Sequence, residues 1–358
     1  MNNLNSLHYA VAQMLIIGFN GFDIDEHHPI TQAIREEGLG GVILFDRDLK
    51  NPGHGKNIES PEQVKTLNKK LQTLALSSGI DNPLPLFIAV DYEGGKVSRL
   101  KPERQFPETL PAQIFATLSD KSAAIEARRM ARTLQELGFN LDFAPLIDVN
   151  VYPDNPIIGQ LGRSFSADPN IVTKYAHIVA TAFSESKITF CYKHFPGHGS
   201  SRGDSHLGIV DVSNTWQPEE LIPYQQLLKK SPYCDMIMSA HIINRQLDPS
   251  GLPASLSPTI LTNLLRQEMH YKGLLVADDL QMKAITDAFG LEESIVMAIN
   301  AGNDLLIFGN QCGDVDYSAE EIIDLIIQNI VNGKISRQRI NESFERITRA
   351  KSKYLKSK

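Results

Sequence analysis

The sequence predicts an α/β fold, a (β/α)₈ barrel of the TIM type formed as a single domain over residues 1–358. Three observations lead to this prediction. Eight short apolar runs recur along the chain, helix-like segments separate them, and titratable residues stand at the ends of several runs. A chain of 358 residues accommodates the roughly 250 residues of such a barrel together with insertions. An open doubly wound sheet is the alternative fold.

The candidate strands are residues 14–19, 41–45, 86–91, 141–148, 188–194, 236–241, 274–279 and 305–309. Nearly continuous apolar strands are typical of parallel sheets covered on both faces. Polar residues favour the barrel over the open sheet, because Asp91, His194, His241 and Asp278 each stand at or just after the end of a strand. In a barrel all the carboxyl ends converge on one face, where active sites are built.

Apolar residues three and four positions apart predict helices between these strands. The segments are 61–76, 119–137, 168–185, 218–230 and 291–301. Two more helices follow the last strand, and in the final one, over 336–354, we expect Ile340, Phe344 and Ile347 to pack on the barrel. Residues 49–59, 152–159 and 244–257 are predicted loops on the catalytic face.

Composition limits the partners and the compartment. The charge balance is 35 − 42 = −7 without a sustained basic run, which predicts no nucleic-acid or membrane partner and favours a neutral or modestly charged substrate. Cys191, Cys234 and Cys312 are odd in number and far apart, which favours a reducing compartment. The beginning of the sequence lacks a signal-peptide pattern, so we expect a cytoplasmic protein, or a periplasmic one if a leader has been removed. A monomer is expected.

The densest chemical signal is Lys-His-Phe-Pro-Gly-His-Gly at residues 193–199, followed by Asp204-Ser205-His206. Glycine and proline let the backbone turn sharply after a strand. Imidazole titrates near neutral pH, and a neighbouring carboxylate stabilises its charged form, so Asp204 and His206 are a candidate acid/base pair. Taken alone, Asp204 is more typical of a turn residue and His206 of a solvated loop histidine, and it is the surrounding motif that favours the catalytic role.

Two further motifs place carboxylates at strand ends. Residues 274–282 form an apolar strand ending in Asp278 and Asp279, of which one side chain points into the barrel mouth because side chains alternate along a strand. The other, assigned to Asp279, has a structural role such as a helix N-cap. In residues 91–99 a pair of glycines brings Asp91 and Arg99 to the same end of the barrel, where they suit a polyhydroxylated ligand.

Other charged residues have simpler explanations. Asp91 is a possible cap, and Arg163 a possible salt-bridge partner of Asp168. Three carboxylates near strand ends are expected to be buried parts of the scaffold, namely Asp142, Asp148 and Asp304.

These motifs, together with Gly162-Arg163-Ser164-Phe165 and Ala301-Gly302-Asn303-Asp304, resemble the single-domain bacterial β-N-acetylhexosaminidases of glycoside hydrolase family 3 over nearly the whole chain. The resemblance implies that Asp278 is the nucleophile, His206 the acid/base and Asp204 the residue that orients it. It also implies that the N-acetylglucosamine is held by Asp91, Arg99, Arg163, Lys193 and His194.

The implied reaction is retaining hydrolysis through a covalent glycosyl-enzyme, without a metal or cofactor. The resemblance points to muropeptide fragments as substrates and so to peptidoglycan recycling. Three alternatives remain open: a phosphorylase on the same scaffold, a non-catalytic sugar-binding protein and a metal-dependent barrel hydrolase. The ligands of the metal site would be His194, His198, Asp204, His206 and His241.

Overall fold

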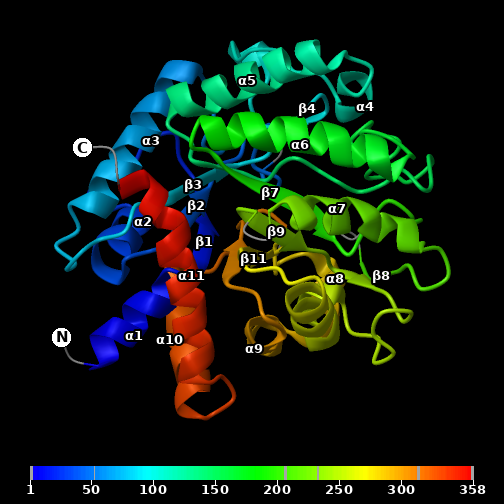
Figure 1. The fold of residues 1–358 in the computed structure, drawn as a ribbon. Coiled ribbons are helices and arrows are strands. Elements are labelled where there is room, and N and C mark those ends of the chain that lie inside the picture. Colours follow the sequence, from blue (N-terminus) through cyan, green and yellow to red (C-terminus); the bar gives the residue numbers. More distant parts are fainter. Residues whose placement is uncertain (1–2, 52, 205–207, 232–233, 313–314, 356–358) are drawn as a thin grey trace.

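A computed structural model of the chain describes residues 3–51, 53–204, 208–231, 234–312 and 315–355, and it shows a closed barrel of parallel strands (Figure 1). The strands follow one another around the barrel in the order β1-β12-β11-β9-β7-β6-β3-β2. This closure confirms the predicted barrel and rules out the open sheet. The strand bounds are β1 Leu15–Gly18, β2 Gly41–Ile43, β3 Phe87–Val90, β6 Leu141–Asp142, β7 Thr189–Phe195, β9 Met236–Ser239, β11 Leu274–Ala277 and β12 Leu305–Phe308.

Helices surround the barrel (Figure 1). Two of the predicted ones, α3 and α9, match the structure at both ends, and Ser60 caps α3 by accepting a hydrogen bond from Gln63 N. The predicted helix 218–230 divides into the turn η3 and the helix α7. The helix bounds are α1 Asn3–Ala12, α2 Pro29–Gln32, α3 Pro61–Leu76, α4 Ala112–Phe115, α5 Asp120–Leu137, α6 Pro169–Glu185, α7 Ile222–Lys230, α8 Lys283–Phe289, α9 Leu291–Ala301, α10 Ala319–Val331 and α11 Arg337–Leu355.

Shorter elements connect these units. The turns of 3-10 or π type are η1 Ala33–Glu37, η2 Pro102–Arg104, η3 Pro218–Leu221, η4 Ala254–Leu256 and η5 Thr259–Glu268. After β3, β4 Tyr92–Gly94 and β5 Val97–Ser98 form an antiparallel hairpin. A second small sheet pairs β8 Val210–Asp211 with β10 Ile242–Ile243. Both small sheets were absent from the prediction, since their strands are too short to show an apolar pattern.

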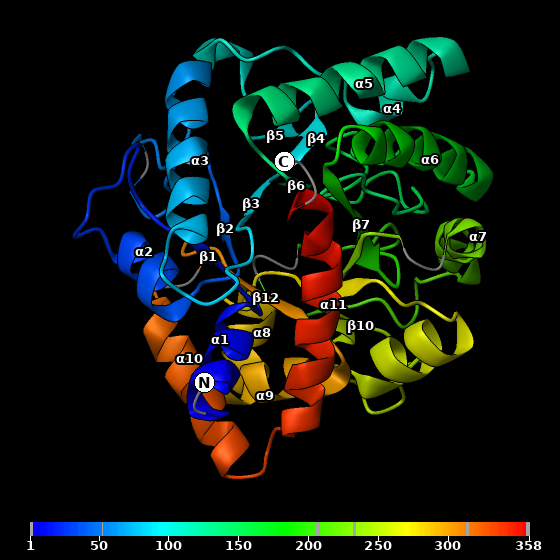
Figure 2. The ribbon, with the colours of Figure 1, turned by 60° about the vertical axis from the view of Figure 1, so that its left-hand side comes forward.

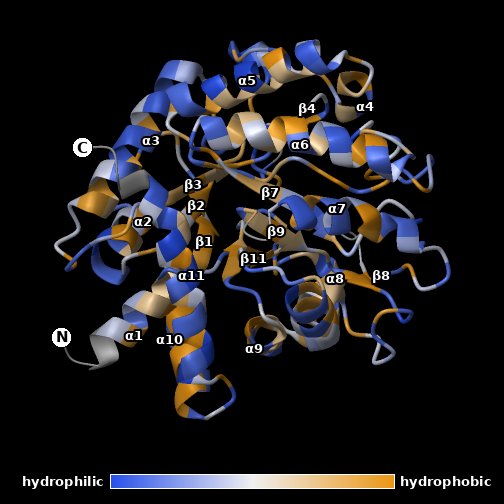
Figure 3. Ribbon diagram, in the orientation of Figure 1, coloured by the Kyte–Doolittle hydropathy of each residue, from blue (hydrophilic) through white to orange (hydrophobic). Residues whose placement is uncertain are grey.

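The barrel strands are buried along their whole length, and Figure 3 shows them as an apolar centre beneath helices with mixed surfaces. One strand is shorter than predicted: of residues 141–148 only Leu141 and Asp142 belong to β6. Pro145 lacks an N–H group and interrupts the ladder. The chain rejoins β7 through a bridge between Leu146 and Lys193.

The C-terminal helix α11 lies beside α1 and packs against the barrel strand β11, and α1 in turn contacts α10 (Figure 2). Its predicted apolar face is confirmed, because Ile340 and Ile347 are fully buried and Phe344 packs on the core. The buried Lys351 donates hydrogen bonds to Gln13 Oε1 and Gly40 O, both at 2.7 Å, at the amino ends of β1 and β2. None of the described helices is long and apolar enough to cross a membrane.

Candidate active site

The barrel order places the predicted site residues around one mouth. Asp91 follows β3 and Asp278 follows β11, and these strands stand four positions apart in the ring of eight, so the two carboxylates lie on opposite sides of the mouth. Lys193 belongs to β7, midway between them. A ligand at the carboxyl ends of the strands therefore lies between Asp278 and the residues around Asp91.

Asp91 is paired with two of the predicted sugar-binding cations. Its Oδ1 lies 2.9 Å from Lys193 Nζ, and its Oδ2 lies 3.5 Å from Arg99 Nη2. Burial by itself would raise the pKa of Asp91, but the charges of Lys193 and Arg99 outweigh it and hold this pKa below its ordinary value. Asp91 is therefore an ionised hydrogen-bond acceptor at the mouth, and the alternative role as a cap is not observed.

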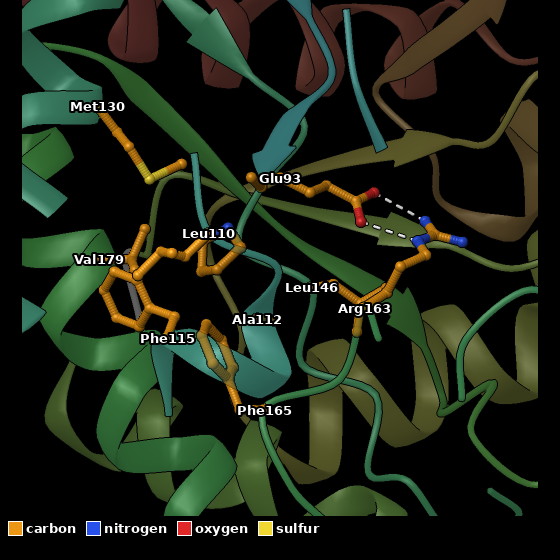
Figure 4. A pocket seen from close by; sticks show the side chains of 11 residues that line it. Glu93, Leu110, Ala112, Phe115, Met130, Leu146, Arg163, Phe165 and Val179 are labelled. Carbon is orange, nitrogen blue, oxygen red and sulfur yellow. Dashed lines mark hydrogen bonds and ion pairs between the residues drawn. The ribbon is translucent and has the colours of Figure 1, made fainter. Parts of the chain in front are cut away.

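Glu93, which the sequence analysis did not select, joins two more of the predicted residues. Its carboxylate binds Arg163 through two parallel hydrogen bonds, at 2.8 and 2.7 Å (Figure 4). The same carboxylate lies 2.7 Å from Lys193 Nζ. Despite burial, these cations hold the pKa of Glu93 well below its ordinary value, and the pKa values of Arg163 and Lys193 are raised. Asp168 caps α6, so the suggested Arg163–Asp168 pair is wrong.

The Glu93–Arg163 pair borders a small cavity of about 20 Å³ (Figure 4). The remaining walls are mostly apolar and include Leu110, Phe115 and Phe165. Water is scarce in such surroundings, so the two charges are weakly screened and the bidentate pair is held firmly.

His194 is oriented by a buried carboxylate. Its Nδ1 lies 2.8 Å from Asp148 Oδ2, and its backbone N–H donates to Asp148 Oδ1 at 3.1 Å. The backbone N–H of His198 donates to the same Oδ1 at 2.8 Å. Asp148, fully buried, is a scaffold residue as predicted, and it sets the direction in which the His194 ring faces.

A second buried carboxylate supports the turn after β7. Glu220 Oε2 accepts hydrogen bonds from the backbone N–H groups of Gly199 at 2.9 Å and Ser200 at 3.3 Å. Gly197 has a φ of +119°, and a Cβ there would lie 2.6 Å from Glu220 Cβ, so the turn requires glycine. These contacts position the start of the segment that leads to Asp204.

The predicted acid/base pair is only partly described. Asp204 lies half-buried in this segment, on the face formed by the carboxyl ends of the strands. His206 lies outside the described residues. The pairing of Asp204 with His206 therefore stays a prediction.

The two neighbouring carboxylates after β11 have different surroundings. Asp278 Oδ1 accepts a hydrogen bond from the N–H of Asp279 at 2.8 Å. The carboxylate of Asp279 accepts hydrogen bonds from Gln281 N at 3.0 Å and from Gly309 N at 3.3 Å, which joins the ends of β11 and β12. Asp279 thus has the predicted structural role, although not as an N-cap, since Met282 occupies that position before α8.

Comparison with known proteins identifies the family. The sequence profile of the family described as "Glycosyl hydrolase family 3 N terminal domain" matches residues 6–350. The chain belongs to glycosyl hydrolase family 3.

The relatives within family 3 that match this chain are named beta-hexosaminidases. Beta-hexosaminidase A of Pseudoalteromonas piscicida is 33% identical over 343 residues, which cover 90% of this chain and 55% of that protein. The beta-hexosaminidase of Idiomarina loihiensis is 33% identical over 300 residues, which cover 79% of this chain and 82% of the relative. The chain thus spans little more than half of the first relative and most of the second.

The solved structure of a family 3 beta-N-acetylglucosaminidase from Paenibacillus sp. str. FPU-7 matches with a TM-score of 0.84 at 30% identity. The match covers 98% of this chain and 62% of that one. The fold of the family 3 barrel is therefore shared over nearly the whole chain.

The metal-dependent alternative requires several ligand side chains gathered around one point. Within the described ranges, no group of three or more His, Cys, Asp or Glu side chains is placed to hold a metal ion. His241 contacts Ser255 Oγ at 2.6 Å and the backbone oxygen of Asp279 at 3.0 Å through its two ring nitrogens. His194 is engaged with Asp148.

Proposed function

We propose that this family 3 barrel is a retaining exo-β-N-acetylglucosaminidase, with Asp278 as nucleophile and His206, oriented by Asp204, as acid/base. The observation that carries the proposal is the placement of Asp278 across the barrel mouth from Asp91, with Lys193, the partner of Asp91, on the strand midway between them. Relatives named beta-hexosaminidase and the similarity to a solved beta-N-acetylglucosaminidase support the substrate class.

The charged side chains that are linked by ion pairs at the barrel mouth, Arg99, Asp91, Lys193, Glu93 and Arg163, suit a neutral sugar. Asp91 is an ionised acceptor, and Lys193 and Arg163 remain protonated at any pH the enzyme meets because their pKa values are raised. Sugar hydroxyls both donate and accept hydrogen bonds, so alternating carboxylates and cations satisfy them. His194, oriented by Asp148, adds a further polar contact in the proposed site.

The reaction then takes two steps with inversion at each. Asp278 attacks the anomeric carbon and forms a covalent glycosyl-enzyme, while protonated His206 donates its proton to the departing glycosidic oxygen. In the second step neutral His206 removes a proton from water, the water attacks the anomeric carbon, and the bond to Asp278 breaks. The sugar is released with its original configuration, and both residues return to their starting protonation states.

The natural substrates in this proposal are peptidoglycan-derived muropeptides that end in N-acetylglucosamine, and catalysis resides in the single barrel domain, acting as a monomer. Unpaired cysteines are typical of a reducing compartment, and Cys191, Cys234 and Cys312 are all free thiols, which supports a cytoplasmic site of action.

The test is the initial rate on p-nitrophenyl β-N-acetylglucosaminide, compared with the β-glucoside, with and without chelator and with phosphate added or omitted. We expect turnover of the N-acetyl sugar that phosphate does not accelerate. Acceleration by phosphate with release of the sugar 1-phosphate would instead show a phosphorylase. Loss of activity in chelator would indicate a metal-dependent hydrolase, and absence of turnover a binding protein.

A further inference from the structure

Asp46, in the loop after β2, is a buried carboxylate with few contacts. It is 8% exposed, and its Oδ1 is buried without a hydrogen-bond partner among the residues that the structure describes. The cation beside it is Arg99, whose Nη1 lies 3.9 Å from this oxygen. Leaving a buried carboxylate oxygen without a donor is unfavourable, and such exceptions in native proteins require a reason.

The guanidinium of Arg99 also has a buried polar atom without a hydrogen-bond partner among the described residues. Its Nε is buried and has no hydrogen-bond partner within the described part of the chain, and its contact with Asp91 is long at 3.5 Å. The guanidinium lies 5.6 Å from the centre of the Phe45 ring, which holds its plane beside the mouth. Arg99 thus lies between Asp46 and Asp91 without a short hydrogen bond to either, and both carboxylates keep capacity for another partner.

The position of Asp46 is fixed by its neighbours in the loop. Asn57 Oδ1 accepts the backbone N–H of Phe45 at 3.2 Å, and Asn57 Nδ2 donates to Phe19 O at 2.8 Å. The buried Lys56 donates hydrogen bonds to the backbone oxygens of Gly309 and Asn310, beyond the end of β12. Asp46 is therefore presented at the barrel mouth by an anchored backbone.

We propose that Asp46 is a specificity-determining residue that, together with Arg99, binds one hydroxyl of the terminal sugar. This inference rests on the proposed function. A hydroxyl has one hydrogen to donate and lone pairs that accept, so a carboxylate and a guanidinium on either side satisfy both. The sugar hydroxyl supplies the donor that Asp46 lacks, and its oxygen accepts from Arg99. Asp46 thus extends the alternating row of charges by one carboxylate, Asp46-Arg99-Asp91-Lys193-Glu93-Arg163.

The test measures kcat/KM for wild type, Asp46→Asn and Asp46→Ala on p-nitrophenyl β-N-acetylglucosaminide and on its 3-deoxy, 4-deoxy and 6-deoxy analogues. We expect Asp46→Ala to lose about 10- to 100-fold on the parent sugar, the effect of one hydrogen bond to a charged group. That loss should vanish on the one analogue that lacks the bound hydroxyl. Asp46→Asn keeps the shape of the side chain and should show the same selective pattern with a smaller loss.

The control is Asp316→Asn, which removes the ion pair that Asp316 makes with Lys50 of the same loop at 2.5 Å. The Asp316 side chain is 47% exposed and is not one of the proposed sugar-binding residues, so this variant should match wild type on all four substrates. An equal loss on all four substrates for the Asp46 variants would show a merely structural role and would overturn the inference.

The rate of the wild-type enzyme on p-nitrophenyl β-N-acetylglucosaminide tests the proposed function separately from the role of Asp46. If wild type turns over none of the substrates, calorimetric binding of N-acetylglucosamine decides the inference instead. Weaker binding by Asp46→Ala than by wild type would support the contact, and equal binding would overturn it.

Discussion

The guanidinium of Arg163 and the carboxylate of Glu93 form a bidentate ion pair, with Nε–Oε2 at 2.8 Å and Nη2–Oε1 at 2.7 Å. The Glu93 side chain is 4% exposed and also neutralises Lys193. One buried carboxylate, that of Glu93, therefore fixes the positions of two proposed sugar-binding cations, Arg163 and Lys193.

Glu93→Gln leaves two buried cations with one negative charge fewer. Breaking a buried pair by removing one partner costs about 3 kcal/mol or more, so we expect the free energy of unfolding to fall by about that amount. We also expect a raised KM for the N-acetyl sugar, since Arg163 and Lys193 lose their fixed positions. Urea unfolding and steady-state kinetics measure the two effects.

The matched control is Glu185→Gln, which removes the partner of Arg128 in a pair on the surface, where the two side chains are 55% and 58% exposed. Exposed pairs contribute about 0–1 kcal/mol, so this variant should be close to wild type in both assays. Equal effects of the two substitutions would contradict the account of Glu93.

Asp278→Ala removes the proposed nucleophile and should lower kcat by about 10⁴-fold or more, with little change in melting temperature. Azide fits the space left by the carboxylate and attacks the same face of the sugar. We therefore expect azide to restore turnover of the aryl glycoside and to yield the α-glycosyl azide, identified by NMR. A β-glycosyl azide would instead indicate that Asp278 has the acid/base role.

Protonation of Glu220 makes the free energy of unfolding depend on pH. Burial raises its pKa to about 7, against the hydrogen bonds it accepts from the turn after β7. A carboxyl whose folded pKa is raised binds more protons in the folded state between its unfolded pKa and about pH 7, so its contribution to stability falls as pH rises through that window. Glu220→Gln lacks this titration.

Relative to wild type, Glu220→Gln should therefore gain about 3 kcal/mol between pH 4.5 and pH 8, because each pKa unit corresponds to about 1.4 kcal/mol. Urea unfolding of both proteins at several pH values measures the difference. A difference that does not change with pH would show that Glu220 keeps one protonation state across this range.

Asp304 is the carboxylate that joins α11 to the barrel. It is fully buried and contacts Arg266, Arg339 and Arg346 at 2.6, 3.0 and 2.9 Å. The arginines outweigh the effect of burial and hold its pKa below the ordinary value. Asp304→Asn should lower the free energy of unfolding by about 3–5 kcal/mol.

The control for Asp304 is Asp287→Asn at an exposed position of α8, which should change stability by less than about 0.5 kcal/mol. Thermal unfolding followed by circular dichroism compares the two variants. If both lose the same stability, the buried cluster is not what holds α11 in place.

The sequence predicts most of the fold because the eight apolar runs are strong local signals. Seven of the eight barrel strands lie within the predicted ranges, and β7 extends one residue beyond its range, to Phe195. Helices α3 and α9 agree at both ends, where Ser60 and Gly290 mark the starts. Prediction is weakest at β6, because the apolar run over 141–148 continues past Pro145, which cannot take part in a regular ladder.

The site is predicted less completely, because ion pairs depend on contacts far apart in sequence. Glu93 and Arg163 are separated by 70 positions, and nothing near Glu93 indicates its partner. The signal that was available is its place beside Gly94-Gly95, directly after Asp91 and Tyr92. Glu220 was missed for the same reason, since its partners precede it by about 20 residues in another loop.

The central claim is a covalent glycosyl-enzyme on Asp278, and trapping it is the most direct measurement. The enzyme is incubated with 5-fluoro-N-acetylglucosaminyl fluoride, its intact mass is recorded, and the labelled peptide is sequenced by tandem mass spectrometry. We expect the mass to increase by one fluorinated sugar, carried by Asp278 in the peptide that follows β11. A label on another residue, or turnover of the aryl glycoside with inversion of the anomeric configuration, would contradict the account.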